Sequence, residues 1–121
     1  VMGIVGLDAA YRPGQAWLDR LYKNIEAKKH YAIKRLTEDT EGSVSVLDAE
    51  GTYLLWLDFK QLNMSDKELQ RFLIEKAKIG LNAGSSYGVD GEQFMRMNIA
   101  CPKETVAAGV DRIVHAIRDF L

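Results

Sequence analysis

The 121-residue chain has one cysteine, two histidines, two prolines and no long apolar run. A single cysteine excludes an internal disulfide and a cysteine-based zinc site, and it fits a reducing, cytoplasmic setting. No run reaches the roughly 20 apolar residues of a membrane span, so no membrane partner is expected. Because the net charge is −1 and no block of Lys or Arg occurs, a nucleic-acid partner is not expected either.

The few residues that could carry chemistry alone stand in unpromising contexts. Cys101 is flanked by Ala100 and Pro102, with no histidine near it, and is interpreted as a small buried hydrophobe rather than a nucleophile. His30 and His115 fall in separate helical patterns, which favours solvated histidines over a metal-binding pair. The carboxylates are scattered, and no pair has the spacing of a general acid and base.

What the chain does have is a hydrophobic content of 47%, enough for one globular domain with a core. Its first ten residues are apolar, contain two glycines and do not begin with Met. We therefore expect the chain to be an excised piece of a longer polypeptide.

Apolar periodicity predicts a long amphipathic helix over residues 13–38, ended by Gly42. Strands are expected at 43–47 and 52–59, joined as a hairpin by the turn 48–51. The second strand is nearly unbroken in apolar residues, which is typical of a strand covered on both faces. Trp17 and Trp56 are interpreted as core residues of these elements.

The second half of the chain predicts a helix, two strands and a final helix. Ser65 and Glu68 form a capping-box pattern that opens the first of these helices, which ends by Gly80. Strands follow at 79–83 and from Phe94, with a loop at 84–91 between them. Pro102 starts the last helix, whose apolar face is formed by Val106, Val110, Ile113, Val114, Ile117 and Leu121.

This order of elements predicts an α+β fold. A small sheet buries one face against helices, so we expect a two-layer sandwich. Its sheet should be mainly antiparallel, with three to four strands and with helices on one face.

The strand "FMRMNIACP" contains a cation, Arg96, in an otherwise apolar run. Period 2 places Met95, Met97 and Ile99 on the core side, and Arg96 and Asn98 on the opposite side. On a solvent-facing surface an exposed arginine needs no explanation. If that face instead roofs a cleft, the guanidinium could bind a carboxylate or phosphate through two parallel hydrogen bonds.

The loop "GSSYGVDG" has glycines at positions 84, 88 and 91. Their spacing matches neither the P-loop nor the dinucleotide-binding fingerprint, and no helix follows at once. A mobile hairpin loop is therefore favoured over a phosphate site.

Several segments together resemble a known family. They are "AAYRPGQAWLDRL" (9–21), "EGTYLLWLDF" (50–59), "LNAGSSYGVDGEQFMRMNIACP" (81–102) and the final helix. The set resembles the carboxy-terminal small domain of class I/II aminotransferases, which are pyridoxal-phosphate enzymes of fold type I. The likeness is greatest to the MalY/PatB branch of cystathionine β-lyase-like C–S lyases.

The resemblance implies roles for parts of this chain. Residues 1–12 would come from the junction with a large domain, and residues 13–121 would form the small domain. Arg96-Met97-Asn98 matches the family's R-x-N, which implies that Arg96 binds the α-carboxylate of an amino-acid substrate. Tyr87 would border the entrance to the active site and is a weaker substrate-binding candidate.

The resemblance also implies partners that this chain lacks. Pyridoxal 5'-phosphate would be the cofactor of the parent protein, held by the missing large domain, and the parent would be a homodimer. The family's Schiff-base lysine and phosphate-binding residues have no match here. Lys67, Lys76, Lys78 and Lys103 are predicted to lie in surface or cap positions, so no catalytic residue and no bound cofactor are expected.

Three functions remain open at this point. The first is the small domain of a C–S lyase that carries out α,β-elimination on sulfur amino acids. The second is the same domain of an aminotransferase. The third, of another class, is a standalone anion-binding or interaction domain.

Overall fold

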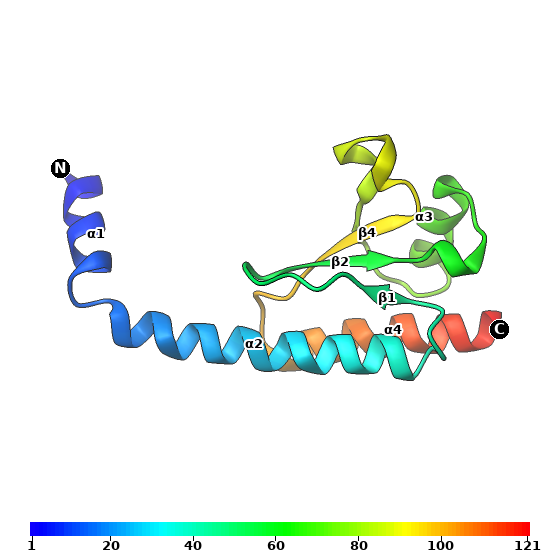
Figure 1. Cartoon of the computed structure of the whole chain (residues 1–121), viewed down its shortest axis with the longest axis horizontal. Coiled ribbons are helices and arrows are strands. Elements are labelled where there is room, and N and C mark those ends of the chain that lie inside the picture. The colour runs from blue at the N-terminus through cyan, green and yellow to red at the C-terminus, as the bar shows by residue number, and fades with distance from the viewer.

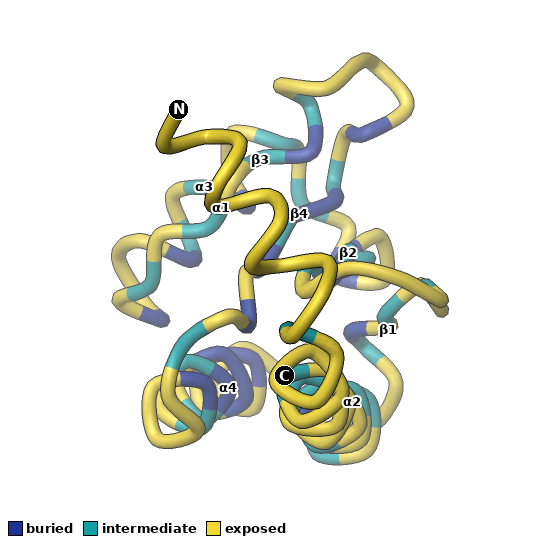
Figure 2. Tube along the Cα trace, turned by 90° about the vertical axis from the view of Figure 1, so that its left-hand side faces the viewer, coloured by how far each residue is buried: buried dark blue, intermediate teal, exposed yellow.

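A computed structural model describes all residues, Val1–Leu121, and contains one four-stranded antiparallel sheet. The strands are β1 (Ser45–Val46), β2 (Leu54–Asp58), β3 (Asn82–Ala83) and β4 (Phe94–Asn98), in the spatial order β1-β2-β4-β3. Helices α2 (Gln15–Glu38) and α4 (Lys103–Phe120) lie side by side beneath it (Figures 1 and 2). The predicted α+β sandwich is confirmed, although β1, β2 and β3 are shorter than predicted.

The core lies between the sheet and these helices. Leu57 pairs with Met95 and Leu55 with Met97, so alternate residues of both central strands point the same way. These residues are buried together with the apolar face of α4, namely Val106, Val110, Ile113, Val114 and Ile117. The opposite side of the sheet, called the open face below, faces away from α2 and α4.

Helix α3 (Asp66–Glu75) closes one end of this core. Ser65 and Glu68 form the predicted capping box, in which the Ser65 amide donates to Glu68 at 2.8 Å and the Glu68 amide donates to Ser65 at 3.3 Å. Leu69 and Leu73 are buried, and the Phe72 ring meets that of Phe120 on α4 edge to face.

Helix α2 packs against the rest of this chain mainly through its second half. Ala32 and Leu36 are buried, whereas Leu18 and Tyr22 on the same apolar stripe are exposed. The interpretation of Trp17 as a core residue is wrong, because its side chain is 61% exposed. Leu121, predicted on the buried face of the last helix, is also exposed.

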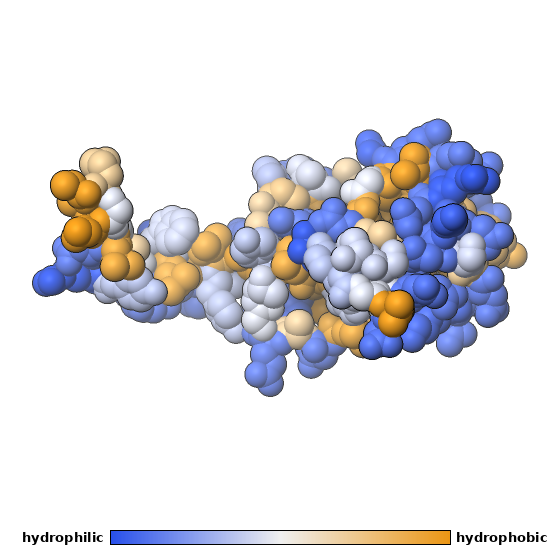
Figure 3. All heavy atoms as spheres, turned by 90° about the horizontal axis from the view of Figure 1, so that it is seen from above, coloured by the Kyte–Doolittle hydropathy of each residue, from blue (hydrophilic) through white to orange (hydrophobic).

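A helix that the sequence patterns did not predict, α1 (Met2–Tyr11), precedes α2. All of its residues are exposed, and it projects away from the body of the molecule (Figures 1 and 2). Its apolar side chains gather at one end of the surface in Figure 3. No helix of the chain combines the length and apolarity needed to cross a membrane.

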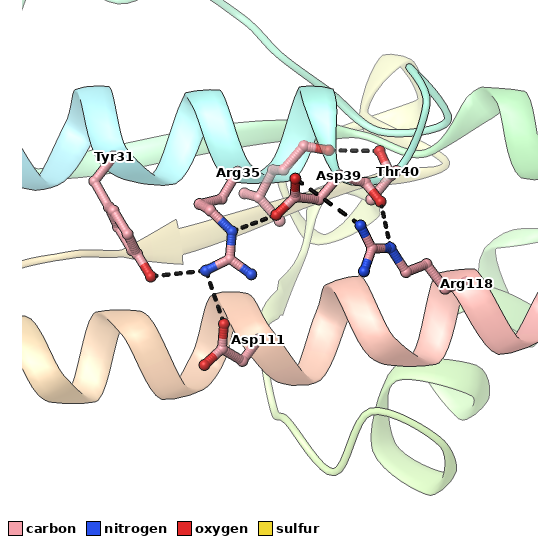
Figure 4. Close-up of polar contacts among 7 residues, drawn as sticks. Tyr31, Arg35, Asp39, Thr40, Asp111 and Arg118 are labelled. Atoms are coloured by element: carbon pink, nitrogen blue, oxygen red, sulfur yellow. Dashed lines mark hydrogen bonds and ion pairs between the residues drawn. The ribbon is translucent and has the colours of Figure 1, made fainter.

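An ionic network joins α2 to α4 (Figure 4). The Arg35 guanidinium binds Asp39 one turn along α2, Asp111 on α4 at 2.9 Å and the Tyr31 hydroxyl at 2.9 Å. Arg118 donates to the Asp39 carbonyl at 2.9 Å. The hydrogen bond from Arg35 lowers the pKa of Asp39, while Asp39 raises the pKa of Arg35.

Because the pKa of Asp39 is lowered, part of the folding stability should depend on pH in acid, and the variant Asp39→Asn should lack that dependence. The ionised Asp39 carboxylate contributes fully to the free energy of unfolding above its pKa in the unfolded chain, about 3.9. This contribution is lost as the pH falls through the lower pKa of the folded state. We expect Asp39→Asn to unfold at a lower urea concentration than the wild type at pH 7, and this difference to shrink as the pH falls through the lowered pKa of Asp39. Urea titrations across this range measure it, with Glu41→Gln as the control. A difference that persists at low pH would contradict the assignment.

Candidate functional site

Arg96 lies in the middle of the open face, in a row that crosses three strands. It pairs with Trp56 on β2 and with Asn82 on β3. Because directly paired residues share a face of the sheet, all three side chains leave the sheet on the open side. The prediction that Arg96 lies opposite the core stripe is therefore confirmed.

The Arg96 side chain is half-buried and has no anionic partner in the chain. Its Nε atom is buried and has no hydrogen-bond acceptor, and its guanidinium takes part in no ion pair. The guanidinium carbon lies 5.2 Å from the centre of the Tyr87 ring, within the range of a cation–π contact. A guanidinium without an acceptor or a counter-ion in its own chain is left able to bind an anion from outside.

Three aromatic side chains cluster on the open face beside Arg96. The Trp56 ring stacks on Phe94, with centres 5.5 Å apart and planes 17° apart, and meets Tyr87 edge to face at 6.0 Å. The interpretation of Trp56 as a core residue is wrong, because it lies half-buried on the open face beside Arg96. Sequence reasoning missed this neighbour because a single strand does not reveal the register of its pairing.

Tyr87 reaches Arg96 because the 84–91 loop folds over the open face. The loop consists of two 3₁₀ turns, η2 (Gly84–Tyr87) and η3 (Val89–Gly91). At the base of the loop the backbones of Gly84 and Gly91 are in close contact. A Cβ on Gly91 would overlap the carbonyl group of Gly84. Gly88 has φ +139°, a conformation that favours glycine. The glycines thus shape a turn, and the expected mobility of the loop stays a prediction.

Asn98 shares the open face but has a local role. Its side-chain oxygen accepts a hydrogen bond from the Ala100 amide at 2.8 Å, just after β4 ends. The R-x-N pattern therefore places one free cation and one locally bonded amide on the same face.

The histidines, lysines and cysteine that the sequence analysis did not assign to a functional site lie outside this one. His30 and His115 are exposed, and so are Lys67, Lys76, Lys78 and Lys103, as predicted. Cys101 is half-buried against the core, and its carbonyl accepts from Lys28 at 2.6 Å. The chain contains no group of His, Cys, Asp and Glu side chains that could hold a metal ion.

A separate groove lies elsewhere on the chain. It is a groove of about 760 Å³ between α2 and the β1–β2 hairpin, lined by residues such as Leu21, Ile25 and Tyr53. Neither Arg96 nor its aromatic neighbours line it. The cation that the sequence indicated and this apolar groove are therefore separate features.

Comparison with known proteins gives consistent results along almost the whole chain. The sequence profile of the family described as "Aminotransferase class I and II" matches residues 6–113. Cystathionine beta-lyase PatB of Bacillus subtilis is 37% identical over 94% of this chain and 29% of its own length. Protein MalY of Escherichia coli is 33% identical over 98% of this chain and 30% of its own length.

A solved structure has the same arrangement of elements. Cystalysin from Treponema denticola, whose crystal structure contains a pyridoxal 5'-phosphate cofactor, superposes with a TM-score of 0.90 at 29% identity. The match covers 100% of this chain and 30% of cystalysin. The chain thus spans about three tenths of the length of the relatives that it matches.

Proposed function

Because the chain belongs to the class I and II aminotransferase family, we propose that it is the small domain of a pyridoxal-phosphate-dependent C–S lyase. In this proposal Arg96 binds the α-carboxylate of the amino-acid substrate, and Tyr87 borders the place where that substrate enters. The membership itself confirms the resemblance drawn from the sequence. The roles of Arg96 and Tyr87 are the part that needs an experiment.

The observation that carries the proposal is the unpartnered Nε of Arg96. A guanidinium presents its N–H groups in a fixed fork that matches the two oxygens of a carboxylate. Each charge-assisted hydrogen bond contributes about 1.5–3 kcal/mol, so two of them would dominate the recognition of a small anion. No acidic side chain of this chain competes for the fork, which leaves it available to a substrate.

The cofactor of this proposal is not held by the residues of this chain. A site for pyridoxal phosphate needs a lysine beside its aldehyde and donors for its phosphate. The four lysines considered above are exposed, and Lys28 is engaged with the Cys101 carbonyl. These residues do not fit the group. We therefore propose that the cofactor is bound by a large domain outside the 121 residues.

The apolar surface of the chain supports such a partner. Residues 1–12 and the first half of α2 expose large apolar side chains, including Ile4, Leu7, Trp17, Leu18 and Tyr22. Surfaces of this kind are typical of contacts with another domain or chain. We propose that residues 1–12 form the junction with the large domain and that residues 13–121 form the small domain. The homodimeric state of the parent stays a prediction.

Transamination is the second candidate, favoured by the description of the matching family profile. A carboxylate clamp would serve both reactions equally, because each begins with the same oriented amino acid. In a full-length enzyme, release of a thiol and pyruvate from cystathionine supports the lyase. Transfer of the amino group to a keto acid without thiol release supports the aminotransferase.

Carboxylate binding by Arg96 can be tested on the 121-residue chain by NMR. We expect the Arg96 Nε–Hε resonance, identified by its loss in Arg96→Lys, to shift on addition of L-alanine. Two hydrogen bonds of this kind correspond to a Kd on the order of 1 mM. L-Alaninamide, which differs only in lacking the carboxylate, is the matched control. Equal shifts with both compounds, or no shift with either, would contradict the proposal.

A further inference from the structure

Asp66, the first residue of α3, binds both ends of the loop that carries Tyr87. Its carboxylate accepts a hydrogen bond from the Ser85 hydroxyl at 2.7 Å and one from the Gln93 amide at 3.3 Å. Gln70, one turn along α3, donates to it at 2.8 Å. Ser85 lies at the start of the loop and Gln93 directly before β4, so one side chain ties the two ends together.

The end of the loop at Gln93 is held by further contacts. The side-chain amide of Gln93 donates to the Met64 carbonyl at 2.8 Å, and its own carbonyl accepts from the Phe59 amide at 3.0 Å. Its backbone has φ +67°, which is unusual for a residue other than glycine. Such a conformation persists only where the surroundings determine it, and the contacts of Gln93 do so.

Between these ends the loop is held by short-range hydrogen bonds, such as the one from the Ser86 hydroxyl to the Ala83 carbonyl at 2.6 Å. Tyr87 is 56% exposed, yet its ring lies over the Arg96 guanidinium and against the edge of Trp56. Since Arg96 has no hydrogen-bond acceptor within the chain, only packing determines where its fork points. The loop sets the position of the Tyr87 ring, and this ring is one of the groups that pack against the Arg96 guanidinium.

We propose that Asp66 is a positioning residue for Arg96, which acts by tying the Tyr87 loop to α3 and so orients the guanidinium for an incoming carboxylate. The identity of that carboxylate rests on the proposed function; the positioning does not. Burial would raise the pKa of Asp66, but the hydrogen bonds from Ser85, Gln93 and Gln70 outweigh it and lower that pKa. The ionised carboxylate accepts all three donors, because it has acceptor sites on both oxygens.

Asp66→Asn tests this role with little change in shape. The Ser85 hydroxyl and the Gln93 backbone amide bind different oxygens of the carboxylate, and the side-chain amide of Asn keeps only one of these oxygens, so it cannot accept from both donors in this geometry. Ser85→Ala removes one end of the tie from the loop side, and Ser85→Thr restores the hydroxyl. The matched control is Glu68→Gln, which alters another acidic residue of the first turn of α3 that caps the helix and makes no contact with the loop.

The first measurement needs no ligand. In the wild type, the Tyr87 ring should shift the Arg96 Nε–Hε resonance, because the guanidinium lies over its face. We expect Asp66→Asn and Ser85→Ala to move this resonance toward the value of an unstructured arginine. Ser85→Thr and Glu68→Gln should leave it in place. A resonance unchanged in both Asp66→Asn and Ser85→Ala would overturn the proposal, as would an equal movement in Glu68→Gln.

The second measurement is the affinity for L-alanine in the same variants. We expect it to fall several-fold in Asp66→Asn and Ser85→Ala and to match the wild type in Glu68→Gln and Ser85→Thr. Urea titration of each variant separates this loss from a general loss of folding. If the wild type binds no L-alanine while Asp66→Asn still moves the Arg96 resonance, the proposed function fails and the positioning role stands. If L-alanine binds equally to wild type and Asp66→Asn, the positioning role fails and the proposed function stands.

Discussion

Replacing Arg96 with alanine in the proposed full-length lyase should lower kcat/KM for the amino acid by about two to three orders of magnitude. The change removes two charge-assisted hydrogen bonds, worth about 3–4 kcal/mol together at the lower end of their range. Most of the loss should appear as a higher KM, because a carboxylate binds similarly in the ground state and the transition state. A smaller fall in kcat is expected, since the carboxylate also helps to orient the Cα–H bond.

Two variants make this result specific to the guanidinium. Arg96→Lys keeps the charge but loses the planar fork, so its kcat/KM should lie between those of the wild type and Arg96→Ala. Arg71→Ala removes an exposed arginine from α3 and should leave the kinetics unchanged. Steady-state rates of thiol release from cystathionine measure all three. An Arg96→Ala enzyme with wild-type kcat/KM would show that Arg96 does not bind substrate.

The position of Arg96 could be predicted from the sequence because it depends only on the geometry of a strand. Successive side chains alternate between faces whatever the strand packs against. Once Met95 and Met97 were assigned to the core, Arg96 had to lie on the other side. The structure adds what alternation cannot supply, namely that the register pairs Arg96 with Trp56 and that Nε has no acceptor.

The same reasoning failed where burial depends on distant parts of the chain. The apolar run around Trp56 predicted a strand covered on both faces, but only the Tyr87 loop covers the open side of this chain. Periodicity found the apolar stripe of α2, yet it contains no information about which half of that stripe meets a partner. Trp17 was therefore assigned to a core that these 121 residues do not form.

Asp66 was missed for a different reason. An acidic residue in the first turn of a helix is favoured by the helix dipole alone, so its presence after Ser65 needed no further explanation. Its hydrogen bonds with Ser85 and Gln93 join residues that are far apart in sequence, and a local sequence pattern cannot predict such contacts. A positioning role of this kind becomes visible only when the fold is known.

The glycine pair at the base of the loop leads to the largest expected effect on stability. Gly91→Ala would place a methyl group so close to the Gly84 carbonyl group that the two overlap. Because the overlapping atoms belong to the backbone, the clash cannot be relieved by rotating a side chain. Overpacking usually costs about 1–3 kcal/mol, and we expect Gly91→Ala to lie at or above the upper end of that range. For a domain whose whole stability is roughly 5–15 kcal/mol, this is a large fraction.

Urea titration compares Gly91→Ala with a glycine that has no such constraint. A Cβ on Gly80 would meet no atom within 4 Å, and its φ is not in the left-handed region, so Gly80→Ala should change stability by less than about 1 kcal/mol. The Gly84→Ala variant should resemble Gly91→Ala, because its Cβ would lie 2.8 Å from the Phe94 carbonyl oxygen and would also overlap Gly91. Equal midpoints for Gly91→Ala and Gly80→Ala would mean that the loop base is looser than described. The loop could then not hold Tyr87 over Arg96, and the explanation of how the guanidinium is oriented would fail with it.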